Sequence, residues 1–385
     1  MKTVLFLLSG FLLMMFLGTV YAWSVFRVEV EMVYQSSTLQ SGLPYMTSLF
    51  FYAISMMITG RLLTINNTRM IVLIGVMLVS VGWFLSSVST TLLLLTMSYG
   101  VLIGVGVGMV YGVPVFIVNQ RYEKSGLYTG IILSGFGASP LVMAPLVHIW
   151  IKDLGLTQTF FIMGTLTLIV LLPLAFMFKT NTVLLKKQET KEYPFSIKTF
   201  VLLYTMFLIA TTIGLMMIGL SYRIGVINYR FNVNHVALSL SFFAVLNGIA
   251  RPLFGWIVDK KGFIFGSGLS ISLIVFASLI ALFNQGNSLV LYGLSMGLFW
   301  FNLGAWLAML PASIKVYFGT HLYAKRYGLM FTSYGFGAII GTVLSGVLLD
   351  VFIETRFLYI LVLVIIVIVL FVTITLKNLR FSFVR

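Results

Sequence analysis

Long apolar stretches recur along the whole chain and restrict what it can fold into. Twelve stretches of about 20 mainly apolar residues are separated by short polar segments. A stretch of this length is what an α-helix needs to cross a bilayer, and inside lipid the helix satisfies its own backbone polar groups. The stretches are 3–26, 43–63, 70–89, 91–118, 126–150, 156–178, 198–222, 235–258, 263–284, 287–314, 326–350 and 354–376. The sequence therefore predicts an all-α membrane protein with twelve transmembrane helices.

The composition agrees with a membrane protein and disfavours an enzyme. Hydrophobic residues make up 60% of the chain and charged residues 9%, whereas soluble domains carry about 25% charged residues. The chain has no cysteine and three scattered histidines, so we expect neither disulfides nor a metal site. It also has no Ser/His/Asp arrangement and no phosphate-binding loop. We therefore expect no enzymatic activity and no cofactor.

The positive charge is distributed as in a membrane protein, so the net charge of +15 does not indicate a nucleic-acid partner. With both termini on one side of the membrane, eighteen of the 24 Lys and Arg fall on that side, and Arg251 falls inside a span. The other side has five: Arg27, Lys152, Arg223, Arg230 and Arg356. The positive-inside rule then predicts cytoplasmic termini. The alternative, a cleaved signal peptide over residues 1–22, would leave eleven spans and disturb this distribution.

One long polar segment divides the chain into two groups of six spans. It covers residues 179–197 and contains Lys186-Lys187-Gln188-Glu189 with no apolar run. We predict an N-terminal six-helix bundle over residues 1–178, a cytoplasmic linker, and a C-terminal six-helix bundle over residues 198–385.

Arg251 is the residue that most directly indicates a function. It lies in the apolar stretch Ser241-Phe-Phe-Ala-Val-Leu-Asn-Gly-Ile-Ala-Arg251-Pro-Leu-Phe-Gly-Trp-Ile-Val-Asp259, with no carboxylate within seven residues on either side. It is roughly 12 Å from the end of that span, at about 1.5 Å rise per residue. A cation at such a depth is costly and usually faces a substrate or ion path. We therefore expect the neutralising anion to be the cargo.

Two loop segments, one in each half, are similar to each other. Gly60-Arg-Leu-Leu-Thr64 follows the second span, and Gly255-Trp-Ile-Val-Asp259-Lys-Lys-Gly262 follows the eighth. The second segment resembles the loop signature of the major facilitator superfamily, Gly-x-x-x-Asp-Arg/Lys-x-Gly, whereas the first has Thr64 in place of the Asp. The resemblance implies two pseudo-symmetric bundles with a site between them, near the middle of the membrane.

Further motifs narrow this resemblance to one branch of the superfamily. They are 18–26 (GTVYAWSVF), 111–115 (YGVPV), 119–122 (NQRY), 126–130 (GLYTG), 134–140 (SGFGASP) and 247–255 (NGIARPLFG). Together they look like the oxalate/formate antiporter family, a bacterial branch related to monocarboxylate transporters. The family resemblance implies a secondary transporter in the bacterial inner membrane whose helix-8 Arg binds the substrate carboxylate. Arg251 matches that Arg.

The chain departs from the oxalate carriers at a second cation. These carriers have a Lys in helix 11 inside an aromatic cage, and Tyr334 occupies its place here. A dianion beside a lone Arg would leave about one charge uncompensated, which costs several kcal/mol. The substrate is therefore predicted to be a monocarboxylate such as formate, lactate or pyruvate. Another organic anion, including oxalate, is the alternative.

The same comparison bears on energy coupling. Proton-coupled monocarboxylate transporters have an Asp one turn before the helix-8 Arg, where this chain has Asn247. No acid falls inside a predicted span, and intramembrane acids are the usual proton relays. Exchange of anions or facilitated diffusion is therefore expected. Proton symport would need the proton to travel on the substrate or on His148.

Polar and aromatic residues near the predicted mid-depth are the other candidates for substrate binding. Tyrosine hydroxyls can donate to a carboxylate, and tryptophan rings can form apolar walls. The candidates are Tyr21, Tyr111, Tyr128, Tyr334, Trp300 and Trp306, together with Asn247 as a ligand or as an orienting partner of Arg251. With 34 Phe, 18 Tyr and 6 Trp in the chain, ordinary packing is the competing explanation for each aromatic residue.

Glycines in two spans resemble a dinucleotide motif only superficially, since no strand precedes them, and close helix packing is the better interpretation. They are Gly100, Gly104, Gly106, Gly108 and Gly112 in one span and Gly130, Gly135 and Gly137 in the next.

The remaining functional alternatives are a drug exporter of the same fold and an anion-sensing receptor. We expect a monomer that interacts with the lipid bilayer and with a small carboxylate.

Overall fold

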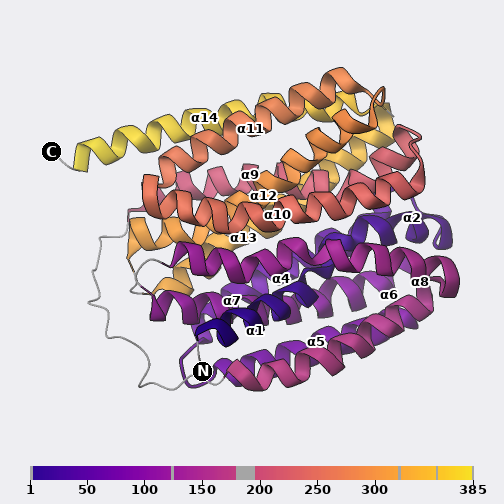
Figure 1. Ribbon diagram of the computed structural model, residues 1–385, viewed down its shortest axis with the longest axis horizontal. Coiled ribbons are helices and arrows are strands. Elements are labelled where there is room, and N and C mark those ends of the chain that lie inside the picture. The colour runs from indigo at the N-terminus through magenta and orange to yellow at the C-terminus, as the bar shows by residue number, and fades with distance from the viewer. Residues whose placement is uncertain (1–2, 123–124, 179–195, 320–321, 353, 384–385) are drawn as a thin grey trace.

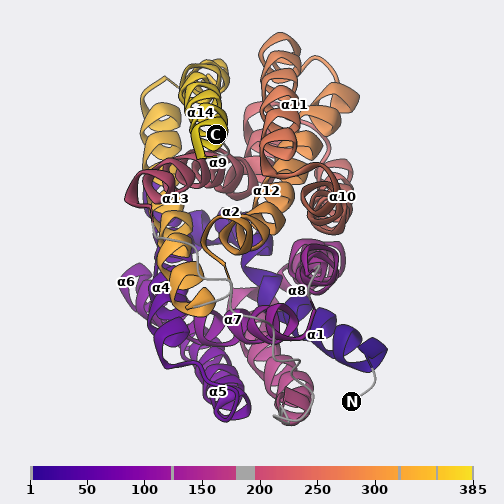
Figure 2. The ribbon, with the colours of Figure 1, turned by 90° about the vertical axis from the view of Figure 1, so that its left-hand side faces the viewer.

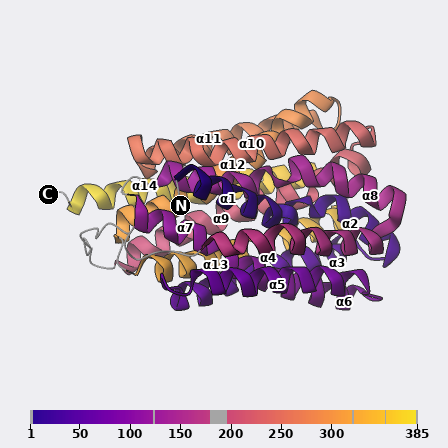
Figure 3. The same ribbon diagram turned by 60° about the horizontal axis from the view of Figure 1, so that its bottom comes forward.

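Helices form all the regular structure in the described part of the chain. The computed structural model describes residues 3–122, 125–178, 196–319, 322–352 and 354–383. The helices lie side by side along one axis (Figure 1). Helix α1 (Thr3–Leu17) begins and helix α14 (Arg356–Phe383) ends at the same end of the bundle (Figure 3). We call this the terminal end and the opposite one the far end.

The N-terminal part continues through η1 (Gly18–Ala22), α2 (Trp23–Val33), α3 (Thr38–Ser41), α4 (Leu43–Leu62), α5 (Thr68–Ser87), α6 (Leu92–Leu95), η2 (Thr96–Ile103), α7 (Gly104–Arg121), α8 (Gly126–Ala175) and η3 (Phe176–Phe178). The C-terminal part consists of α9 (Ile197–Arg223), η5 (Ile224–Asn228), α10 (Val233–Lys261), α11 (Phe263–Asn284), α12 (Leu289–Phe318), α13 (Tyr323–Phe352) and α14.

The described helices account for twelve membrane crossings. Eleven continuous helical segments are long and apolar enough to cross a membrane. The longest, Gly126–Phe178, breaks at Gly155, whose φ of +81° is a left-handed conformation that glycine adopts without steric cost. The chain reverses there, so this segment supplies two crossings. The predicted fold class is therefore confirmed.

The first crossing is longer than the sequence predicted. It runs from Val4 to Val33, whereas the apolar stretch ends near residue 26. Arg27 was expected outside the membrane helix, and this was wrong: it lies within α2 and is only 1% exposed. The helix continues because hydrogen bonds and an ion pair with Glu31 compensate the charge of Arg27 inside the bundle.

The N-terminal and C-terminal helices lie on two sides of the molecule (Figure 2). They meet where α8 packs on α10 and where α4 packs on α13. Glycines allow the backbones to approach closely: a Cβ on Gly130 would lie 2.6 Å from the Arg251 carbonyl oxygen, and one on Gly60 would lie 2.5 Å from the Ala324 carbonyl oxygen. Both glycines serve helix packing, which was expected for Gly130, whereas Gly60 was considered only as part of a loop motif. The predicted linker lies outside the described residues except for its last two, and the domain division remains a prediction.

Candidate functional site

Arg251 is held at the contact between α10 and α8. It is fully buried, and ten residues separate it from the end of α10 at Lys261, which corresponds to about 15 Å of helix. Its Nη1 donates a hydrogen bond to the carbonyl oxygen of Leu133 in α8 at 2.7 Å. Among the described residues, no carboxylate lies within ion-pair distance of the guanidinium. In the described part of the chain, therefore, hydrogen-bonding dipoles and an aromatic ring face this charge, and no acid does.

Asn247 orients this guanidinium. Its Oδ1 accepts a hydrogen bond from Arg251 Nη2 at 3.1 Å, and its Nδ2 donates to the carbonyl oxygen of Trp300 in α12 at 2.5 Å. The two residues are one helical turn apart on the same face of α10. Both polar atoms of the amide are used, so Asn247 occupies the position of a support for Arg251.

Gly137 of α8 leaves room for this arrangement. A Cβ at this position would lie 2.2 Å from Asn247 Oδ1 and 2.9 Å from Arg251 Nε. Only a residue without a side chain allows α8 to pass so close to both polar groups.

One aromatic ring contacts the guanidinium, and further rings pack around it. The Arg251 Cζ lies 5.6 Å from the centroid of the Phe136 ring, a cation–π distance. The Phe136 ring makes edge-to-face contacts with Tyr21 and Tyr111, and the distances between ring centroids are 5.0 Å and 5.4 Å. The centroid of the Trp300 ring lies 6.5 Å from that of the Tyr21 ring. The structure thus brings four of the candidate residues, Tyr21, Tyr111, Trp300 and Asn247, together with Arg251.

Tyr334 belongs to the same cluster through a hydrogen bond. Its hydroxyl lies 2.9 Å from that of Tyr21, across the contact between the N-terminal and C-terminal helices. The Tyr334 ring stacks on the Phe331 ring with 4.8 Å between centroids, and its centroid lies 5.5 Å from that of the Tyr52 ring. Tyr334 is therefore hydrogen-bonded to another tyrosine at the position where the resemblance led us to look for a second cation.

Besides Phe136, three residues of this aromatic cluster were not predicted. They are Tyr52 of α4 and Tyr327 and Phe331 of α13. The centroid of the Tyr52 ring lies 5.2 Å from that of Tyr111 and 5.1 Å from that of Phe331. The centroids of Tyr327 and Phe331 are 5.8 Å apart. The spacing of Tyr327, Phe331 and Tyr334 by four and then three residues was the available signal, since it puts three rings on one face of α13. Tyr52 has no such signal in the sequence.

Several buried donors of the cluster have no hydrogen-bond partner among the residues that the structure describes. They are the Nε of Arg251 and the hydroxyls of Tyr111 and Tyr327. Tyr111 packs on Phe136, whose ring contacts the guanidinium, and Tyr327 packs on Phe331 of the same cluster. Buried polar groups are normally paired, so donors that converge near one guanidinium are suited to a ligand that offers only acceptors.

The remaining two candidates lie elsewhere. Tyr128 is partly buried near the beginning of α8 and stacks on Tyr122 at 4.2 Å. Trp306 is buried against Phe263 of α11, with a ring distance of 6.1 Å. Among the described ring contacts, none joins these two to the cluster around Arg251.

Cavities lead towards the cluster from the terminal end. One of about 460 Å³ lies between α4, α7 and α13, and Arg61, Gln120 and Lys325 are among its lining residues. A second, of about 10 Å³, shares part of that lining and reaches Tyr327. Together they trace a narrow route from the terminal end towards the aromatic cluster.

Comparison with known proteins agrees with this architecture. The family model described as Major Facilitator Superfamily matches residues 3–314. The chain is 25% identical over 334 residues to the uncharacterized MFS-type transporter YhjX of Escherichia coli (strain K12), covering 84% of this chain and 82% of that protein. It is 24% identical over 345 residues to the oxalate:formate antiporter of Oxalobacter formigenes (87% and 82%), and 22% identical over 321 residues to monocarboxylate transporter 12 of Xenopus laevis (72% and 67%).

Proposed function

Because this chain belongs to the Major Facilitator Superfamily and is therefore a membrane transporter and not an enzyme, we propose that it carries a small monocarboxylate held by Arg251. Formate, lactate and pyruvate are the expected substrates. The relatives agree with the resemblance found in the sequence, since they include an oxalate:formate antiporter and monocarboxylate transporters.

A lone buried guanidinium supports this proposal most directly. Arg251 is fully buried with no carboxylate partner in the described part of the chain, and its Nε has no acceptor. Within the described ranges, the hydroxyls of Tyr111 and Tyr327 are also without a hydrogen-bond partner. A carboxylate has two acceptor oxygens and no donor when it is ionised. It would pair with the guanidinium and accept from the nearby hydroxyls.

The charge of the cluster favours a monoanion. Arg251 supplies one positive charge, and the residue at the second cation position is Tyr334, which hydrogen-bonds to Tyr21. One bound carboxylate makes this site neutral, whereas a dianion would leave a negative charge in a buried place. Oxalate is the second candidate, because one relative is named for it.

The residues of the cluster favour exchange over proton symport. The position one turn before Arg251 is Asn247, whose amide does not titrate, and it is engaged by Arg251 and Trp300. No Asp or Glu is among the described residues that contact Arg251. We expect one anion to leave as another enters, with access alternating between the two ends of the bundle.

The same proposal includes the orientation of the chain. The terminal end faces the cytoplasm of a bacterial cell, because most Lys and Arg fall on that side. The cavity lined by Arg61 and Lys325 then opens to the cytoplasm. The protein acts as a monomer, with two six-helix bundles joined by the segment 179–197.

Counterflow in proteoliposomes tests the proposed function. Vesicles loaded with unlabelled lactate, formate or oxalate are diluted into the corresponding labelled acid. We expect counterflow of at least one monocarboxylate to exceed that of oxalate. Oxalate transported better than every one- to four-carbon monoacid would contradict the charge argument, and no counterflow of any acid would contradict the substrate class.

A further inference from the structure

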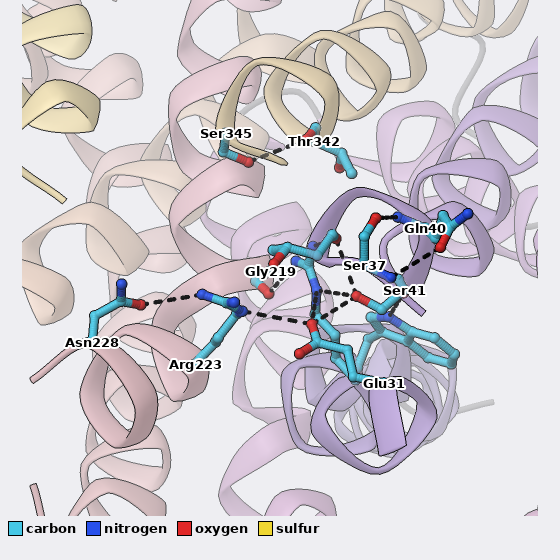
Figure 4. A network of polar contacts seen from close by, with 12 residues as sticks. Glu31, Ser37, Gln40, Ser41, Gly219, Arg223, Asn228, Thr342 and Ser345 are labelled. Atoms are coloured by element: carbon cyan, nitrogen blue, oxygen red, sulfur yellow. Dashed lines mark hydrogen bonds and ion pairs between the residues drawn. The ribbon is translucent and has the colours of Figure 1, made fainter. Parts of the chain in front are cut away.

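A network of polar contacts closes the far end of the bundle, and Glu31 of α2 is at its centre (Figure 4). Glu31 Oε1 accepts a hydrogen bond from Ser41 Oγ at 2.8 Å. The same oxygen lies 3.6 Å from the Nε of Arg27 and 3.6 Å from the Nε of Arg223. Arg27 precedes Glu31 by one turn of α2, whereas Arg223 is the last residue of α9. One carboxylate therefore joins cations from the N-terminal and the C-terminal helices.

Arg27 makes a second connection between the same two groups of helices. Its Nη1 donates to the carbonyl oxygen of Gly219 in α9 at 3.0 Å. On its own side it donates from Nε to Ser41 Oγ at 3.0 Å and from Nη2 to the carbonyl oxygen of Thr38. Ser41 is fixed in turn, because its carbonyl oxygen accepts from Trp23 Nε1 at 3.2 Å. The N-terminal part of the network is thus a rigid arrangement that receives α9.

Close packing accompanies these polar contacts. A Cβ on Gly42 would lie 2.6 Å from Cγ2 of Thr342 in α13, and Thr342 is only 4% exposed. Tyr45 donates a hydrogen bond to the carbonyl oxygen of Leu215 at 3.3 Å. These contacts also join N-terminal helices to C-terminal ones, so the far end is closed.

Alternating access requires these contacts to separate. When the far end opens, α9 and α13 must move away from α2 and α3. The Arg27 bond to Gly219 and the Glu31 pair with Arg223 then break together. Separating two partly buried opposite charges costs free energy because each loses its partner. The pair therefore stabilises the closed arrangement as long as both charged residues are present.

We propose that Arg27, Glu31 and Arg223 form a latch that holds the far end of the transport path closed. The proposal rests on the transport function of the superfamily and not on which anion is carried. A nearby ion pair, Glu354 with Arg356, provides the contrast. Glu354 lies in the loop between α13 and α14, Arg356 begins α14, and each side chain is 52% exposed. That pair therefore lies within the C-terminal part, crosses no moving boundary and contributes little.

Site-directed thiol labelling tests the latch without any substrate. The chain contains no cysteine, so single cysteines can be introduced without removing others. Thr342→Cys reports the far end. Thr59→Cys reports the terminal end, because Thr59 is 6% exposed and lines the narrow cavity there. Purified protein in detergent micelles exposes both ends to the same thiol reagent, which makes the assay independent of orientation.

We expect Glu31→Gln and Arg223→Gln each to speed labelling of Thr342→Cys by at least about fivefold and to slow labelling of Thr59→Cys, since one population grows at the expense of the other. The variant that carries both changes should resemble the single variants, because each single change already removes the pair between Glu31 and Arg223. Glu354→Gln is the matched control and should leave both rates unchanged. Unchanged labelling of Thr342→Cys would overturn the latch, and so would faster labelling of both cysteines, which would indicate general loosening. Arg223→Gln keeps the test available if Glu31→Gln does not fold.

Discussion

Replacing Asn247 by Asp provides an internal competitor for the cargo. The change keeps the size of the side chain but places a carboxylate where the amide now accepts from Arg251 Nη2 at 3.1 Å. The guanidinium then has a counter-ion of its own. If Arg251 is the anion anchor, transport should fall although no residue of the cluster has been truncated.

The size of the effect follows from the distance between the two groups. At 3.1 Å and an effective dielectric constant of about 20, two unit charges attract by roughly 5 kcal/mol before desolvation is subtracted. A net advantage of only about 1.4 kcal/mol would weaken substrate binding tenfold. The variant also loses the hydrogen bond from Nδ2 to the Trp300 carbonyl oxygen, which contributes about 0.5–1.5 kcal/mol. We expect monocarboxylate counterflow at pH 7 to fall at least tenfold.

The dependence on pH separates charge competition from structural damage. As pH falls, the introduced carboxyl takes up a proton and no longer competes, so counterflow by Asn247→Asp should recover relative to the wild type. Asn247→Ala is the control, because it loses both hydrogen bonds without gaining a charge. It should transport less than the wild type but show no such recovery. Wild-type counterflow by Asn247→Asp at pH 7 would refute the assignment of Arg251 as the anion anchor.

Two other predictions concern selectivity and access. Tyr334→Lys should weaken monoanion transport and shift preference towards oxalate, because it adds a second cation and removes the Tyr21 hydrogen bond; competition counterflow measures the ratio, and an unchanged ratio would contradict the charge count. Arg61→Gln combined with Lys325→Gln should raise the apparent KM for substrate supplied at the terminal end by about threefold, because both cations line the cavity there and attract anions at a distance. Lys198→Gln, at another exposed position near that end, is the control, and equal KM changes in both variants would contradict a role for the cavity.

The sequence predicted the fold because each crossing has its own signal. Apolar length alone located the helices, and the break at Gly155 falls in the gap between the predicted spans 126–150 and 156–178. The first crossing was misjudged because Arg27, Glu29 and Glu31 lower its hydropathy. Only the structure places Ser41 and the Gly219 carbonyl where they compensate Arg27. A local window cannot include partners that lie far away in the sequence.

The candidate site was predictable where charge made a residue unusual. Arg251 is conspicuous in an apolar span, and Asn247 follows from helical spacing. Tyr52 and Phe331 were missed because the chain has many aromatic residues in similar surroundings. Which of them face Arg251 depends on how α4 and α13 pack, and Tyr128 shows the converse error, since the structure stacks it on Tyr122.

Binding to the Arg251→Gln variant tests the central claim most directly. The change removes the fixed charge while keeping a polar side chain of similar length, and a charge-assisted carboxylate contact contributes roughly 1.5–3 kcal/mol. The measurement is the Kd of the preferred monocarboxylate for purified wild type, Arg251→Gln and Arg251→Lys, with counterflow on the same preparations. We expect Arg251→Gln to lose at least tenfold in affinity and in transport, and Arg251→Lys to recover only part of the loss, because Lys lacks the planar two-pronged donor. Wild-type affinity and transport in a folded Arg251→Gln protein would contradict the claim that Arg251 binds the cargo.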